Sequence, residues 1–239
     1  MHTALRMAAA FAAAFVLAAC TPKGGANVKI TESSFSSDNS EVKAQGFEIS
    51  GLRNKAFCDE VNRNVKADID GALVSFDTMV AENEADLIMG NRCILDITQQ
   101  VKYNQNNILS IIEEHYVYTG GPHGMSSRYP RNYDLENSRQ FYLSDIFNDG
   151  YKERMDRLMT EQREKDPERY GELWDIPRIR DEHERNFYFT DGRLVIFFAP
   201  YELSYYAKGF VEFELPLSEL SGVMKEEWRE RLIGLLPDA

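Results

Sequence analysis

The sequence predicts an α+β fold in which helices pack on one face of an antiparallel sheet. Short runs of β-branched and aromatic residues recur along the chain, and two longer stretches carry apolar residues every three to four positions. An Asp-Gly pair between aromatic and β-branched runs predicts a hairpin late in the chain. Of the 239 residues, 43% are hydrophobic and 12% aromatic. A substantial core is therefore expected, and disorder is not.

The first half of the chain is expected to start the sheet and to place one long helix on it. Strands are expected at 28–32 and 42–49, around a loop rich in Ser, Asp and Asn. A strand at 93–103 alternates apolar and polar residues, whereas the next, at 108–118, is apolar on parts of both faces, which favours a central position. Between the two pairs lies an amphipathic helix over 57–82, with its apolar stripe at Phe57, Val61, Val65, Ile69, Leu73, Phe76 and Val80.

The second half is expected to add strands and covering helices. A strand at 126–135 is followed by a helical turn within 142–147, for which Ser144 or Asp145 is the expected cap. Residues 151–170 are mostly charged and predict a solvated helix. A hairpin is expected from 186–189 and 194–198 around Asp191-Gly192, then a half-exposed strand at 210–215. A final helix over 217–235 should cover the sheet.

The first twenty residues are typical of a bacterial lipoprotein signal. Arg6 precedes an uncharged run over 7–19 that is too short for a comfortable membrane span, and Leu17-Ala18-Ala19-Cys20 resembles the lipobox. We expect a signal peptide at 1–19, a lipidated Cys20 with a tether at 20–27, and membrane anchoring through the acyl chains. An ordinary signal peptide with a chance cysteine is the alternative. Because Thr21 stands where Asp would retain the protein at the inner membrane, we expect the periplasmic face of the outer membrane.

The net charge bears on the class of partner, and the cysteine content bears on disulfide formation. The formal net charge of −12 disfavours nucleic acid and suits a basic protein. Once Cys20 is lipidated, Cys58 and Cys93 remain, and we expect a disulfide between them in an oxidising compartment. The closed loop of about 35 residues would add roughly 3–4 kcal/mol of stability. Free thiols in redox chemistry are the alternative, although the chain has no Cys-x-x-Cys.

A tight corner connects the strands at 108–118 and 126–135. It reads Gly120-Gly121-Pro122-His123-Gly124, and it must bend sharply because Gly admits positive φ while Pro fixes φ near −65°. The corner presents His123 for chemistry or binding, or it is only a strand connection. No second His, Cys or nucleophile stands at ligand spacing, so we expect neither a metal nor a cofactor.

Several segments together resemble a known arrangement. They are the corner at 120–124, Asn-Tyr-Asp-Leu at 132–135, Phe-Tyr-Leu-Ser-Asp-Ile-Phe at 141–147, and the stretch 187–209 with Phe-Phe-Ala-Pro-Tyr-Glu at its centre. As an ordered set they resemble the C-terminal domain of the anti-sigma factor RsiV. The part up to about residue 118 is similar to the companion domain found beside it, and in the peptidoglycan deacetylase PdaC outside that enzyme's catalytic domain. We therefore expect a region at 28–118 and a second at 119–239, integrated into one globular unit.

The resemblance implies an extracytoplasmic α+β module for binding or sensing, and in RsiV that module binds lysozyme. We expect no membrane-spanning or sigma-binding segment as in RsiV and no deacetylase domain as in PdaC, so only the binding role carries over. The expected ligand is peptidoglycan or a basic, lysozyme-like hydrolase. Aromatic rings on loops make good anchors, so the expected binding residues are Gly121, Pro122 and His123 of the corner, with Tyr201, Glu202, Tyr205 and Tyr206.

Two other functions remain open. The first is a cell-wall hydrolase or deacetylase-like enzyme in which His123 acts with Glu113, Glu114, His115 or Glu202, although no Gly-x-Ser-x-Gly, His-Glu-x-x-His or Gly-rich phosphate loop is present. His183 lies in a charged run and is expected to be solvated. The second is a structural envelope lipoprotein that docks another protein.

Overall fold

The computed structural model describes residues 13–15, 24–83 and 92–234 of the chain. These fall into two compact units. The N-terminal unit contains 27–99 and 113–127 with the short strand β1, and the C-terminal unit contains 100–112 and 128–234 with the residues just before 27, each counted over its described residues. The expected regions at 28–118 and 119–239 stay a prediction.

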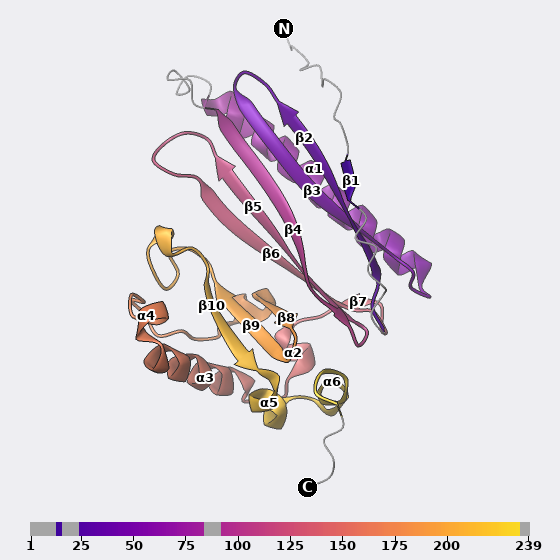
Figure 1. Ribbon diagram of the computed structural model, residues 1–239, viewed down its shortest axis with the longest axis vertical. Coiled ribbons are helices and arrows are strands. Elements are labelled where there is room, and N and C mark those ends of the chain that lie inside the picture. Colours follow the sequence, from indigo (N-terminus) through magenta and orange to yellow (C-terminus); the bar gives the residue numbers. More distant parts are fainter. Residues whose placement is uncertain (1–12, 16–23, 84–91, 235–239) are drawn as a thin grey trace. The chain divides into compact units, whose positions relative to one another are not determined.

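The fold is α+β, as expected, with a seven-stranded sheet in the order β1-β2-β3-β4-β5-β6-β7 and a three-stranded sheet in the order β10-β9-β8 (Figure 1). The central position of β5 is confirmed. The strands of the larger sheet are β1 (Ala13–Phe15), β2 (Asn27–Ser36), β3 (Ser40–Ser50), β4 (Cys93–Gln105), β5 (Ile108–Tyr118), β6 (Met125–Asp134) and β7 (Arg139–Gln140).

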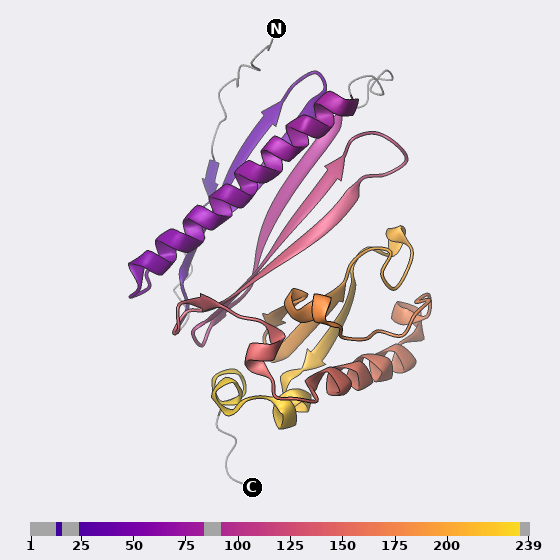
Figure 2. The ribbon, with the colours of Figure 1, turned by 180° about the vertical axis from the view of Figure 1, so that it is seen from behind.

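One strand pair departs from the antiparallel expectation. β3 and β4 are parallel, with Ser40 opposite Cys93, and the helix α1 (Lys55–Asn83) connects them. A parallel neighbour needs such a crossover, because a hairpin turn can only reverse the chain. The larger sheet is therefore mixed. Figure 2 shows α1 lying across the face of the sheet at β2 and β3, and the buried side of the helix includes Val61, Val65 and Phe76.

The crossover explains why the expected disulfide is wrong. Both Cys58 and Cys93 are buried with free thiols, and burial raises the pKa of Cys93. Cys93 shares a core cluster with Phe76, whereas Cys58 lies eighteen residues earlier on the same helix, about 27 Å away at 1.5 Å per residue. A disulfide needs Cα atoms within about 7 Å. In a parallel crossover the first turn of the helix lies far from the start of the next strand, a point that sequence spacing does not reveal.

The C-terminal unit builds its core between the small sheet and several helices. Met155, Leu158 and Met159 of α3 share one cluster with Phe198 of β9 and Phe213 of β10. The expected hairpin is confirmed, with Phe189 opposite Leu194 and Thr190 opposite Arg193. The elements are α2 (Leu143–Ile146), α3 (Tyr151–Lys165), α4 (Pro167–Tyr170), η1 (Asp181–Arg185), β8 (Phe187–Thr190), β9 (Arg193–Phe198), η2 (Tyr206–Lys208) and β10 (Val211–Pro216).

Two expected helices are interrupted. The helix expected over 151–170 ends at Lys165, and Asp166 caps the next turn, α4, by accepting a hydrogen bond from the Arg169 N–H at 3.0 Å, since Pro167 favours a first helical position. The helix expected over 217–235 divides into α5 (Leu217–Leu220), η3 (Ser221–Val223) and α6 (Glu226–Leu232). It breaks because Met224 is extended and bridges to Phe147.

Candidate functional site

The His123 corner bends sharply at 120–122, as expected, and two of its hydrogen bonds join near neighbours. Gly120 and Gly121 have φ of 105° and 91°, in the range that glycine tolerates best. The Tyr118 hydroxyl donates to the Gly121 carbonyl at 3.1 Å. His123 is exposed, and its Nδ1–H donates to the Gly124 carbonyl at 2.8 Å. The corner therefore presents the imidazole at the surface on a backbone that its own residues fix.

Gly124 is required for packing at this corner. It is buried, and a Cβ at this position would lie 2.5 Å from the Tyr116 ring. The Tyr116 ring thus closes over the Gly124 backbone.

The residues expected to assist His123 are distributed between two places. On β5, His115 Nε2 lies 2.9 Å from a Glu113 carboxylate oxygen, and the other oxygen accepts from the Gln99 amide at 2.7 Å. Glu113 is only 1% exposed, so the pair is largely screened from solvent. Glu202 belongs to the C-terminal unit. Among the described residues no group of three or more His, Cys, Asp or Glu side chains is placed to hold a metal ion.

The strongest exposed feature of the C-terminal unit is a set of aromatic side chains, which we call the aromatic platform: Trp174, Tyr201, Tyr205 and Tyr206. Trp174 is 58%, Tyr201 51% and Tyr205 43% exposed. The rings of Tyr201 and Tyr206 lie 5.6 Å apart. Three of these residues come from the expected loop between β9 and β10, which Figure 1 shows near α4. Exposed aromatic side chains gathered in one place are typical of a binding surface.

Hydrogen bonds fix the platform at the polar ends of its side chains. The backbone N–H of Trp174 donates to the Leu203 carbonyl at 3.0 Å. The indole Nε1–H of the same residue donates to the Glu202 carbonyl at 3.4 Å. The Tyr205 hydroxyl donates to the Glu172 carboxylate at 2.5 Å, and this bond raises the pKa of Tyr205. These bonds hold the side chains of Trp174 and Tyr205 in place although both residues are exposed.

Tyr201 carries an unusual backbone. Its φ of 71° is left-handed, a conformation that is uncommon for a bulky residue and costs of order 1 kcal/mol or more. Such strain persists only where the surroundings impose it, and it gathers at functional sites. The loop is thus built to present this ring.

His183 and Glu202 lie behind the platform. His183 is 2% exposed, so the expectation that it is solvated is wrong: its ring packs edge-on against Phe198 with centroids 5.1 Å apart, and its Nε2 contacts the Glu202 carboxylate. Burial by itself raises the pKa of Glu202, but hydrogen bonds from His183 and from the Ala199 N–H outweigh it and hold that pKa below its ordinary value.

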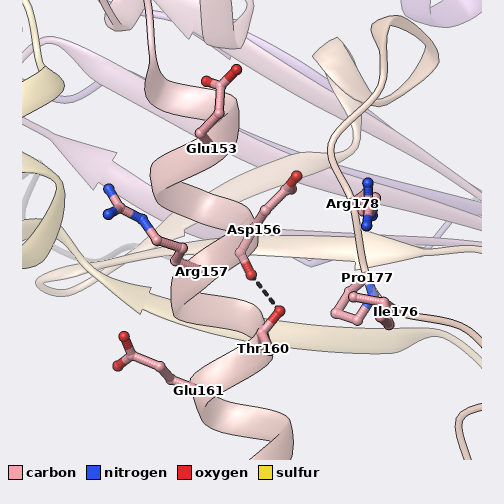
Figure 3. A pocket seen from close by; sticks show the side chains of 8 residues that line it. All are labelled: Glu153, Asp156, Arg157, Thr160, Glu161, Ile176, Pro177 and Arg178. Carbon is pink, nitrogen blue, oxygen red and sulfur yellow. Dashed lines mark hydrogen bonds between the residues drawn. The ribbon is translucent and has the colours of Figure 1, made fainter.

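A groove of about 390 Å³ lies between α3 and the segment at 176–178. Figure 3 shows Asp156 and Thr160 on the helix side and Ile176, Pro177 and Arg178 on the other. Ile176 is 47% exposed. The Asp156 carboxylate accepts from the Ile179 N–H at 2.7 Å, and burial raises the pKa of this carboxyl. Ile176 lies two residues after Trp174 in the sequence, so one segment contributes to both the platform and the groove.

Sequence reasoning found the loop residues of the platform but not the segment that completes it. Trp174, Glu172 and His183 come from a stretch between α4 and β8 with no regular pattern. One signal was present: Trp174 and Ile176 stand among charged residues just before Pro177, and large apolar residues in a polar loop indicate a contact surface.

The expected lipid site at Cys20 lies outside the described residues, together with most of the expected signal peptide and part of the tether. Within the described part of the chain, none of the helices combines the length and the apolar character needed to cross a membrane.

Two family profiles match successive parts of the chain. Residues 34–126 match the family described as deacetylase PdaC, and residues 144–218 match a family described as a protein of unknown function, DUF3298. The expected order, a PdaC-like region followed by a domain of unknown function, is therefore confirmed. A comparison with curated proteins gives no match.

Solved structures of DUF3298 family proteins share the fold. One, from Bacteroides fragilis NCTC 9343, superposes with a TM-score of 0.68 at 18% identity, over 85% of this chain and 96% of the other. Another, from Pseudomonas aeruginosa PAO1, superposes with a TM-score of 0.54 at 16% identity, over 92% of this chain and 94% of the other.

Proposed function

Because the chain carries a PdaC-like region followed by a DUF3298 domain, we propose that it is a binding protein of the bacterial cell envelope whose aromatic platform holds the glycan of peptidoglycan. The protein is tethered by lipid on Cys20 and faces the periplasm from the outer membrane. The proposal rests on one observation above all: Trp174 and Tyr205 are largely exposed and yet hydrogen-bonded at the polar ends of their side chains.

Rings held in this way suit a sugar chain. The apolar face of a pyranose stacks on an aromatic face, and a ring that is already ordered loses little side-chain entropy on binding. Carboxylates at the edge of the platform, such as Glu172 and Asp175, accept hydrogen bonds from sugar hydroxyls. The groove beside Ile176 gives a long ligand a second place to contact the protein.

Co-sedimentation of the purified protein with insoluble peptidoglycan tests the proposal. Trp174→Ala and Tyr205→Ala should each raise the Kd about tenfold, since a well-placed aromatic anchor contributes roughly 1.4 kcal/mol or more. Tyr129→Ala, which removes another exposed tyrosine at 46% exposure, is the matched control and should leave the Kd unchanged. His123→Ala in the same assay tests the corner. No binding by the wild type, or equal losses in all variants, would contradict the proposal.

A basic, lysozyme-like protein is the second candidate ligand, favoured by the net charge of −12 and by the exposed carboxylates near the platform. Opposite charge raises the rate of association and makes it sensitive to salt. Binding to lysozyme that weakens steeply as salt rises, together with glycan binding that is absent at every salt concentration, would favour this candidate over the first.

A further inference from the structure

Glu202 joins three segments behind the aromatic platform. Its carboxylate accepts one hydrogen bond from His183 Nε2 of η1 and another from the Ala199 N–H at the end of β9, at 2.8 Å. Its backbone carbonyl accepts from the Trp174 indole at 3.4 Å. Tyr201, the residue with positive φ, directly precedes it. The position of Glu202 therefore sets the position of two platform rings.

His183 is fixed in one tautomer. Its Nδ1 accepts a hydrogen bond from the Arg180 N–H at 2.9 Å, so the proton is on Nε2, which donates to Glu202. Both ring nitrogens are thus engaged in a buried position. An imidazole in this state has no lone pair for a metal or for general-base catalysis, and its contacts serve to orient Glu202.

The surroundings of the pair keep Glu202 ionised. The hydrogen bonds from His183 and the Ala199 N–H and the positive charge of Arg180 favour the carboxylate form. The Glu202 carboxylate is half-buried, and the two hydrogen bonds that it accepts orient it, because leaving the buried His183 donor unpaired costs about 1–3 kcal/mol.

We propose that His183 is a positioning residue for ligand binding: through Glu202, it aligns Trp174 and Tyr201 so that the platform presents its rings to the ligand. This inference rests on the proposed function of the platform. It assigns a role in binding to a buried residue that no ligand touches.

Two substitutions separate alignment from general stability. In His183→Gln the amide nitrogen stands where Nε2 stood and can still donate to Glu202, whereas the acceptor for the Arg180 N–H is lost. In His183→Asn the amide oxygen replaces Nδ1 and keeps the bond to Arg180, but the side chain is too short to reach Glu202. Each variant loses one hydrogen bond, so the two should lose similar free energies of unfolding, measured by urea denaturation.

The two variants should then differ in their Kd for peptidoglycan, measured by co-sedimentation. We expect the Kd of His183→Gln to stay within about threefold of the wild type and that of His183→Asn to rise about tenfold, which is roughly 1.4 kcal/mol. Equal losses of affinity in the two variants, or losses that follow the free energy of unfolding, would overturn the inference.

A ligand-free measurement keeps this inference apart from the proposed function. Acrylamide quenching of tryptophan fluorescence reports Trp174, because Trp228 is fully buried. Quenching should increase in His183→Asn and not in His183→Gln. If that difference appears while no form binds peptidoglycan, the positioning role stands and the glycan proposal fails. Unchanged quenching in His183→Asn would overturn the positioning role.

Discussion

The His123 corner and the loop between β9 and β10 both follow a strand and both use left-handed backbone, but they are held in different ways. In the corner, hydrogen bonds join residues one and three positions apart, and the left-handed residues are glycines. In the loop, hydrogen bonds span 19, 28 and 33 positions, and the residues with positive φ are Tyr201 and Gly209.

This difference is the basis on which we propose a site at the loop and a strand connection at the corner. The glycines of the corner adopt positive φ at little cost. The loop is ordered only when distant segments fold around it, and those segments impose a strained backbone on a large exposed ring. The strain and the long-range bonds are the reason that we place binding at the loop and not at the corner.

The largest expected effect comes from a substitution in the core beneath the loop. Phe198→Ala deletes a fully buried ring that packs against His183 and Phe213, so the free energy of unfolding should fall by about 3–5 kcal/mol. Under native conditions the loop should lose order while the corner keeps it. Amide hydrogen exchange resolved by residue measures both, and unchanged protection at 199–206 would contradict the comparison.

A smaller loss of stability is expected from a substitution in the corner. In Gly124→Ala the added Cβ meets the Tyr116 ring at 2.5 Å, so the ring must swing away, at a cost of about 1–3 kcal/mol. The loop should be unaffected. Gly222→Ala is the control, because a Cβ there meets nothing within 4 Å, and chemical denaturation should place it near the wild type. Equal stability of the two variants would show that the corner is not tightly packed.

The smallest expected effect is acid dependence at the loop. Because the folded pKa of Glu202 lies below its ordinary value of 4.5, its stabilising contribution is present above that value and is lost as the pH falls through the lowered folded pKa. The advantage of the wild type over Glu202→Gln should therefore be greatest near neutral pH and shrink below about pH 4.5. Urea denaturation across this range measures it. The Asp134 carboxyl, beside Arg231, also has a lowered pKa. Its contribution to the pH dependence is the same in the wild type and in Glu202→Gln, so it cancels in the difference between them. A difference that does not change with pH would be the contrary result.

The parts of the fold that were predictable are those that a local sequence pattern determines. Alternation in β4, the helical stripe of α1 and the Asp-Gly hairpin each depend on residues close in sequence, and each element formed where it was expected. The parallel pairing of β3 with β4 was not predictable, because strand direction depends on how a long crossover returns to the sheet. The break in the final helix was missed for a similar reason: Met224 is drawn into a bridge with Phe147, a distant partner.

The candidate site followed the same rule. Tyr201, Glu202, Tyr205 and Tyr206 were named from their own loop, because aromatic residues in a short polar segment stand out. His183 was misjudged since its neighbours are charged, yet its ring enters the core beside Phe198. Residues of one site that come from different segments are recognised only after the segments have been brought together.

The separation of Cys58 from Cys93, which the length of α1 imposes, has a consequence for folding. Before α1 forms, nothing holds the two sulfurs apart, and an oxidant can join them. A chain closed in this way cannot extend α1 to full length or seat Cys93 in the core, so it has to be reduced or rearranged before it matures. Native burial then shields both thiols. Wherever an oxidant is present, the speed of folding relative to oxidation therefore decides how much of the protein reaches its final shape.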